Sequence, residues 1–226
     1  MLFLNKSIVM NTREKIVFTG KRLFNQQGFG ATTLYQIAQA IGISRGNLTY
    51  YFKDKEALLT EIASEMTLQY QKRMGDFQFP SWENTYNATK AFHKIQRAYA
   101  FIFEDKQVME FAPVKKQIQR IYEDDLKRQM AIVSFSIQVG NMREETIPGT
   151  YHNLVRTLWT NSFFWLLSDV YQDMEEETGW DKIAWSLILP HFTPKGLAAF
   201  KKHFGEDYYQ SLGKAYERSV SQAVGF

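Results

Sequence analysis

The 226-residue chain contains no cysteine. This absence excludes disulfide bridges, thiolate catalysis and zinc sites built on cysteine ligands. Histidine is scarce as well, and the four histidines, at positions 93, 152, 191 and 203, form no HxxxH or ExxH pair. P-loop and GxGxxG stretches are also missing from the sequence. We therefore expect a protein that is not an enzyme, with no catalytic residue, no metal site and no cofactor.

The sequence also lacks any run of about 18 apolar residues, the length that a membrane-spanning helix requires. The apolar start MLFLNKSIVM has no small-residue cleavage site of a secretory signal. We expect no membrane partner and a cytoplasmic location. A helix-start pattern follows Met10 at once, so residues 1–10 are expected to be an extension, disordered and outside the fold.

Charge is distributed unevenly along the chain. Residues 1–60 hold eight Lys/Arg against three Asp/Glu, whereas the remainder holds nineteen against twenty-one. A basic first quarter joined to a slightly acidic body indicates that one end meets a polyanion. A solvated basic face would explain the same imbalance, so charge alone leaves both readings open.

Apolar residues recur at helical spacing throughout, which predicts an all-α protein. Four helices are expected in the first 75 residues: 11–28, 33–42, a short one after 44, and one from 55 to about 74. Each expected start has a side chain suited to cap it: Asn11 with Glu14, Thr33 with Gln36, Ser44, and Asp54.

The stretch Gly75–Trp82 contains Pro80 and reads as a linker. It divides a DNA-binding domain at 11–60, whose last helix continues to about 74 as a connector, from a helical body at 76–226. Within the body we expect long helices near 83–104, 113–139 and 148–174, the last two opened by Pro113 and Pro148. Shorter helices are expected after Thr178, Thr193 and Glu206.

Two helices joined by a short glycine-containing turn match the helix-turn-helix, whose second helix lies in the DNA major groove. On a helical wheel of residues 45–52, Leu48 and Phe52 face inward. Gly46, Asn47 and Tyr50 fall on the opposite side, with Thr49 and Tyr51 at the flanks. Side chains of these types can contact base edges and phosphates.

Lys55 is expected in the first turn of its helix, where a cation is locally unfavourable. A bound phosphate would resolve this conflict, because helix N-termini bind phosphate through free N–H groups. For each residue taken alone, an ordinary surface side chain is the competing explanation; the joint pattern favours DNA contact.

These residues resemble the amino-terminal domain of TetR-family transcriptional regulators over about residues 11–60. The resemblance rests on Thr33, Ile37-Ala38, Gly42-Ile43-Ser44, Gly46, Leu48, Tyr50-Tyr51-Phe52 and Lys55-Glu56-Ala57-Leu58-Leu59. It implies an all-helical homodimer that binds double-stranded DNA with its first three helices and a small-molecule effector with its body. The implied DNA contacts are Thr33, Arg45, Asn47, Thr49, Tyr50, Tyr51 and Lys55, beside Gly46, which permits close approach. Gly20 and Thr49 depart from the family pattern, which usually has alanine and often tyrosine there.

The body, 76–226, offers no motif for one ligand class. Residues 158–167, LWTNSFFWLL, are apolar on nearly every side, which predicts that the helix 151–174 pairs with a second subunit; a central helix in a larger monomeric core is the alternative. We expect a largely apolar cavity of about 300–1,000 Å³. Candidate lining residues are Phe92, Tyr99, Phe103, Phe111, Met130, Phe135, Trp159, Asn161, Phe163 and Trp185, with His93 and Arg156 as further polar candidates; ordinary core packing explains such aromatics equally well.

The predicted function is a ligand-responsive transcriptional regulator, a repressor that a small apolar or amphipathic molecule releases from its operator. The alternatives are an architectural, ligand-independent DNA-binding protein and an all-α enzyme. A body without a cavity would favour the first alternative. A cluster of acid–base side chains would favour the second.

Overall fold

The computed structural model describes residues 10–75, 80–172 and 180–214, with side chains for all of these except 163–172 and 214. The chain forms two compact units. Unit 1 holds the chain up to Leu68 together with Ala98–Ile118, and unit 2 holds Gln69–Arg97 together with the chain from Gln119 onward. The sequence predicts a single boundary at residues 75–82. In the structure, Ala98–Ile118 packs with the amino-terminal unit, so unit 1 is made of two separate segments of the chain. The described residues are helical, which confirms the all-α prediction.

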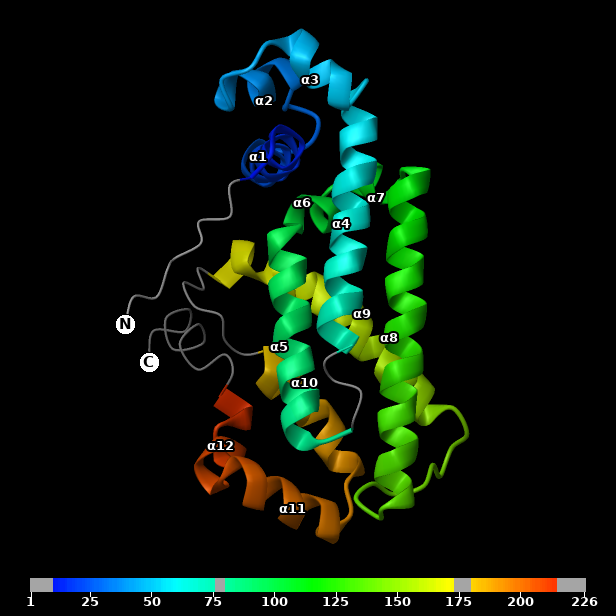
Figure 1. The fold of residues 1–226 in the computed structure, drawn as a ribbon. Helices are drawn as coiled ribbons and strands as arrows, with labels where there is room; N and C mark the ends of the chain where they lie inside the picture. Colours follow the sequence, from blue (N-terminus) through cyan, green and yellow to red (C-terminus); the bar gives the residue numbers. More distant parts are fainter. Residues whose placement is uncertain (1–9, 76–79, 173–179, 215–226) are drawn as a thin grey trace, which may run out of the picture. The chain divides into compact units, whose positions relative to one another are not determined.

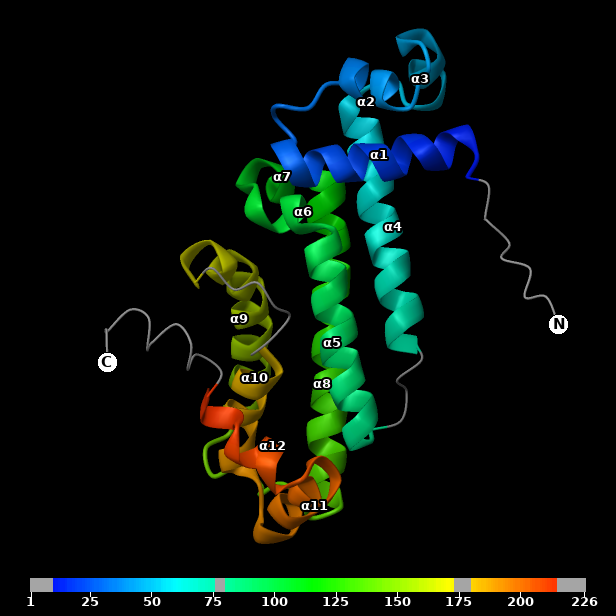
Figure 2. The same cartoon turned by 90° about the vertical axis from the view of Figure 1, so that its left-hand side faces the viewer.

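Unit 1 is built on four amino-terminal helices, and each expected cap is present. The helices are α1 (Thr12–Gln27), α2 (Leu34–Ala40), α3 (Arg45–Tyr51) and the first part of α4 (Lys55–Gly75). The capping boxes at Asn11 and Thr33 are complete, and the Ser44 side chain accepts a hydrogen bond from the Asn47 N–H. The Asp54 carboxylate accepts from the Ala57 N–H at 2.7 Å. In Figure 2, α1 lies across the first turns of α4.

The core of unit 1 explains the unusual glycine in α1. Ile16, Phe24, Ile37 and Leu58 are completely buried. A Cβ atom at Gly20 would lie 2.8 Å from the Cδ2 atom of Leu58, closer than van der Waals contact allows. Glycine lowers helix propensity by up to about 1 kcal/mol relative to alanine. Here it lets the backbone of α1 approach α4 closely.

The helix expected over 83–104 is broken, which corrects the prediction. It forms α5 (Trp82–Ala98) and α6 (Ala100–Glu104), followed by α7 (Lys106–Glu110). Tyr99 at the break has non-helical backbone angles. The Asn25 side chain of α1 binds both sides of the break: its amide N–H donates to the Ala98 carbonyl at 3.0 Å, and its oxygen accepts from the Phe101 N–H at 3.1 Å. The side chain thus supplies partners to backbone groups at the helix break.

Unit 2 contains the remaining helices, which Figure 1 shows in green to red. Besides α5 and the end of α4, they are α8 (Ala112–Gln138, from residue 119), α9 (Thr150–Gln172), α10 (Trp180–Ile188), α11 (Pro194–Phe204), α12 (Glu206–Gln210) and the 3₁₀ turns Leu189–His191 and Leu212–Lys214. Thr193 caps α11 as predicted, with its hydroxyl accepting from the Gly196 N–H at 3.1 Å. Thr178 lies outside the described residues.

The start of α9 differs from the prediction that Pro148 opens this helix. Gly149 has a φ of 86°, in the left-handed region, so the helix begins after it, at Thr150. The Glu145 carboxylate accepts hydrogen bonds from the backbone N–H groups of Tyr151 and Gly149. These bonds, that from Tyr151 first, hold the pKa of Glu145 below its usual value. Glu145 therefore acts as the cap of α9.

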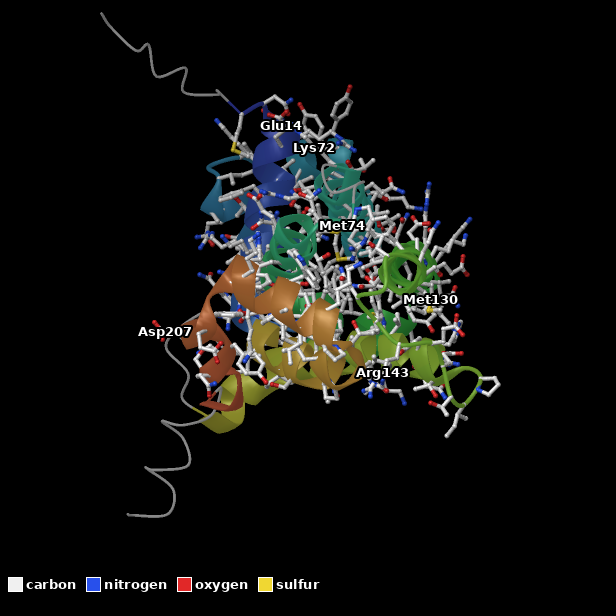
Figure 3. All side chains as sticks on the ribbon, turned by 90° about the horizontal axis from the view of Figure 1, so that it is seen from below. Glu14, Lys72, Met74, Met130, Arg143 and Asp207 are labelled. Carbon is white, nitrogen blue, oxygen red and sulfur yellow. The ribbon has the colours of Figure 1, made fainter. Side chains whose placement is uncertain are left out.

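The core of unit 2 is rich in aromatic rings from α5, α10 and α11. Trp185 and Phe200 are buried, with ring centroids 5.1 Å apart, and Trp82 packs against both. The α8–α9 loop docks beside them, because the Arg143 N–H donates to the His191 carbonyl at 3.0 Å and the Thr193 N–H donates to the Asn141 carbonyl at 2.9 Å. Figure 3 shows Arg143 on this loop. The packing therefore fixes the loop that closes one end of unit 2.

Candidate nucleic-acid interface and internal cavity

The α2–turn–α3 segment has the helix-turn-helix geometry that the sequence predicts. The turn passes through Gly42, whose φ of 74° is in the left-handed region. The Ile43 N–H donates to the Ala38 carbonyl at 3.0 Å and closes the turn. Figure 1 shows α2 and α3 adjacent on either side of it. Leu48 and Phe52 are buried at 0% and 4% exposure, which anchors α3 and fixes the side it presents to solvent.

The solvent side of α3 carries polar and aromatic groups. Arg45, Gly46 and Asn47 are exposed, and Tyr50 is 84% exposed, the highest value among the exposed large hydrophobic residues. A ring so exposed contributes nothing to the buried core of unit 1. Its hydroxyl can reach a phosphate or a base.

The flanks of α3 are more restricted, as the helical wheel predicts. Thr49 is half-buried and donates its hydroxyl to the Gly46 carbonyl at 3.0 Å, so its methyl group and lone pairs remain for outside contacts. Tyr51 is 37% exposed, and its ring packs edge-on against Tyr50 at 5.2 Å. Thr33 is exposed, but its hydroxyl is engaged in the α2 capping box.

Lys55 makes contacts within the chain that the sequence did not predict. Its ammonium donates to the carbonyls of Phe29, Thr32 and Gly30 at 2.7, 2.9 and 3.4 Å, and lies 4.3 Å from the centroid of the Phe29 ring. An ammonium has three N–H donors, so this arrangement uses all of them. Three carbonyl oxygens, rather than a phosphate, offset the unfavourable position at the helix start. The side chain ties the α1–α2 loop to α4.

Two exposed side chains near this surface were not among the predicted contacts. Tyr35, in the first turn of α2, is 62% exposed. The Lys53 side chain is 84% exposed and lies 3.8 Å from Asp54. A tyrosine opposite the apolar stripe of α2 is a signal that a helical wheel of that helix would have found. Both side chains can contribute to phosphate binding.

Unit 2 contains a cavity of about 280 Å³, slightly below the expected range. Residues from α5, α8, α9, α10 and the α8–α9 loop line it: Pro80, Ser81, Trp82, Thr85, Gln129, Ile132, Val133, Phe135, Ser136, Asn141, Met142, Leu154, Val155, Leu158, Trp185, Ile188 and Phe192. Two predicted lining residues, Phe135 and Trp185, are among them. The wall is mainly apolar and aromatic, and none of its described side chains is charged.

A smaller hollow of about 60 Å³ shares Thr85, Gln129 and Trp185 with the larger cavity. The predicted residues Phe92 and Trp159 line this hollow, with their ring centroids 5.2 Å apart. The two spaces thus adjoin along one wall.

The hollow also contains a buried charge pair. The Arg128 guanidinium donates to Asp125, and the Tyr70 hydroxyl donates to the same carboxylate at 3.3 Å. Burial, together with the nearby Asp125 charge, raises the pKa of Tyr70. Tyr70 is therefore a neutral hydrogen-bond donor, and these groups bond mainly to one another.

The other predicted ligand residues line neither space. Tyr99, Phe103 and Phe111 lie in unit 1, where Tyr99 is fully buried and donates its hydroxyl to Glu65 at 2.9 Å. Four more lie in unit 2 away from the two walls: Met130, Asn161, His93 and Arg156. The side chain of Phe163 lies outside the described residues.

Within residues 10–75, 80–172 and 180–214, no group of three His, Asp or Glu side chains could hold a metal ion. Of the helices described, none is both long and apolar enough to cross a membrane.

Comparison with known proteins places the amino-terminal domain. Residues 16–62 match the family model of bacterial regulatory proteins, tetR family. The HTH-type transcriptional regulator AcrR of Shigella flexneri is 39% identical over 75 residues, which covers 30% of this chain and 35% of that protein. The chain thus matches about a third of the length of its curated relatives.

Solved structures share the fold over a larger part of the chain. A TetR-family transcriptional regulator from Marinobacter aquaeolei VT8 has a TM-score of 0.75 at 19% identity, covering 91% of this chain and 99% of that one. SmeT, the repressor of the Stenotrophomonas maltophilia multidrug efflux pump SmeDEF, in complex with triclosan, has a TM-score of 0.61 at 16% identity, covering 82% and 93%. At these identities the likeness shows the fold alone. The sequence match of residues 16–62 confirms the resemblance over the helix-turn-helix domain, which is that of bacterial regulatory proteins of the tetR family.

Proposed function

We propose that this chain is a transcriptional regulator that binds a double-stranded DNA operator as a homodimer and is released from it by a small apolar or amphipathic effector. The exposed face of α3 carries this proposal. Buried Leu48 and Phe52 hold the helix from behind, while Asn47 and Tyr50 project from its open side. A rigid helix with polar groups on one side can read base edges in the major groove.

The distribution of charge supports DNA as the partner. The excess of Lys and Arg lies within residues 1–60. Arg45 and Lys53 are exposed next to α3, where they can neutralise phosphates. Arg13 is engaged with Glu61 at 2.8 Å and stacks over Phe52, so it serves the fold instead.

The effector part of the proposal rests on the cavity of unit 2. An architectural DNA-binding protein has no need of a mainly apolar cavity of about 280 Å³, because the side chains around an empty space lose favourable packing contacts. The name of the SmeT–triclosan complex indicates that a protein of this fold accepts a small molecule. The apolar sequence of residues 158–167 in α9 supports the homodimer. The side chains of residues 163–172 are not among those that the structure describes. A sedimentation experiment that finds only monomer at micromolar concentration would count against the homodimer.

The DNA proposal is tested by first selecting an operator from a random duplex library. Fluorescence anisotropy then compares the native protein with Asn47→Ala and Tyr50→Ala on operator and scrambled duplexes. We expect each variant to lose roughly 1–3 kcal/mol on the operator and little on scrambled DNA. Both variants should keep the native melting temperature, because neither side chain packs in the core. Unchanged operator binding by both folded variants would refute the proposed role of α3.

A further inference from the structure

The larger cavity of unit 2 has an unusual combination of wall groups. Its apolar surface comes from rings such as Trp82, Trp185 and Phe192. Among the described side chains on this wall, none carries a charge. A charged ligand group would therefore leave water without an opposite charge to pair with, which is strongly unfavourable.

Five neutral polar side chains also line this cavity. The hydroxyls of Ser81 and Thr85 are engaged in bonds within α5 and its cap, which leaves Gln129, Ser136 and Asn141. Within the described part of the chain, no hydrogen bond engages the side-chain polar atoms of these residues. Two of them are amides, each with two N–H donors and one carbonyl acceptor. The wall thus offers unused donors and acceptors, all of them uncharged, next to aromatic rings.

The adjoining hollow has one guanidinium, that of Arg128, whose charge is paired with Asp125 although its Nε–H has no hydrogen-bond partner. The Arg128 guanidinium donates to Asp125, and Asp125 accepts from Tyr70 as well. The Asp181 carboxylate, also on this wall, accepts from the Tyr208 hydroxyl at 2.7 Å. The hollow has two carboxylates and one guanidinium, so its net charge is negative. Among charged ligands a cation would therefore bind there more readily than an anion, and the experiment must test a cation.

We propose that the effector is an uncharged aromatic molecule carrying a hydroxyl or carbonyl group, held by ring packing against Trp82 and Trp185 and by hydrogen bonds to Gln129 and its neutral neighbours. That the ligand acts as an effector rests on the proposed function, whereas the kind of ligand depends only on the side chains of the cavity. The proposal narrows the class of effector from apolar or amphipathic molecules to uncharged ones.

Three probes with the same ring system test the proposal: 2-naphthalenemethanol, 2-naphthoate and 2-naphthylmethylammonium. Isothermal titration calorimetry on the full chain without DNA should give binding of the alcohol at least about tenfold tighter than that of either ion. Equal or tighter binding of the carboxylate or the ammonium would overturn the proposal. So would failure of all three probes to bind.

A conservative variant locates the hydrogen bond. Gln129→Met keeps the length of the side chain and removes its polar atoms, so affinity for the alcohol should fall about tenfold while affinity for naphthalene stays unchanged. Gln138→Met makes the same substitution at an exposed position of α8 and should change neither value. Equal loss of both ligands in a folded Gln129→Met variant, or no loss of the alcohol, would contradict the assignment.

The two proposals can fail separately. If the protein binds the alcohol but selects no operator, the proposed function is refuted and the proposed ligand class stands. If it binds an operator but prefers a charged probe, the ligand class is refuted and the proposed function stands.

Discussion

Lys53 and Lys55 stand two positions apart and should respond to substitution in opposite ways. The Lys53 side chain is 84% exposed, whereas the Lys55 ammonium donates to three carbonyls of the α1–α2 loop. Lys55→Ala leaves the carbonyls of Phe29 and Thr32, both partly buried in these bonds, without their charged donor. Loss of such bonds costs about 1–3 kcal/mol of unfolding free energy. Lys53→Ala touches no packed group and should change stability by less than about 0.5 kcal/mol.

DNA binding should separate the two lysines in the other direction. Lys53→Ala should lower the slope of log K against log salt by about one, as expected for one lost phosphate contact. Lys55→Ala should leave that slope nearly unchanged once binding is corrected for the folded fraction. Urea denaturation gives the stability, hydrogen exchange of residues 28–33 gives the order of the loop, and anisotropy at several salt concentrations gives the slope.

One result would refute this reasoning directly. If Lys55→Ala keeps the native unfolding free energy and lowers the salt slope by one, the ammonium contacts phosphate in the complex, as the sequence first indicated. The bonds to the loop carbonyls would then belong to the free protein only.

Three further substitutions test the packing around the two units. Asn25→Ala should cost about 1–2 kcal/mol and speed hydrogen exchange at the helix break, because two backbone groups lose their partner; unchanged exchange would contradict this. Gly196→Ala would place a Cβ atom 2.0 Å from the Asn141 carbonyl oxygen and should cost roughly 3 kcal/mol in urea denaturation, whereas Gly213→Ala meets nothing within 4 Å and should be nearly neutral. Glu145 has a lowered pKa, so its stabilising effect is present above the unfolded pKa of about 4.3 and is lost as pH falls through the folded value. Glu145→Gln should therefore lower the melting temperature at neutral pH, with the difference disappearing in acid; a constant difference would exclude this ionisation as the cause.

The helix starts could be predicted from sequence because capping is local. The Asn11 and Thr33 side chains bond to groups three residues away, and the structure contains both capping boxes. The burial of Leu48 and Phe52 was predictable for the same reason, since a short helix with two apolar positions on one side has one way to pack.

Features that depend on distant residues were missed. Asn25 binds the break in the α5–α6 region across 73 and 76 positions of the chain, and no local pattern near Tyr99 reports it. Lys55 reaches carbonyls 23 to 26 residues away, which no pattern at its helix start reports, and its contact with phosphate stays a prediction. The list of cavity residues failed similarly, because aromatic side chains on helices do not reveal which of them face an empty space.

The prediction of cavity residues from sequence omitted the polar side chains of the wall. Gln129 and Asn141 were not predicted. Asn141 lies in the α8–α9 loop, but Gln129 lies on α8, where an amide beside apolar residues must find a partner or a space. In the described part of this chain they line a space. A search for polar residues inside apolar stripes would have pointed to that wall more directly than a search for aromatics.

If both proposals hold, an effector that lowers operator affinity must change the position of α5. This helix is unbroken from Trp82, which lines the cavity, to Ala98, whose carbonyl accepts the hydrogen bond of Asn25 in α1. A ligand changes DNA affinity only through contacts that differ between two states of the protein. A displacement of α5 along its axis would strain the two Asn25 bonds, which lie at the carboxyl end of this helix. By linkage, operator DNA must then weaken the ligand by the same factor as the ligand weakens the operator.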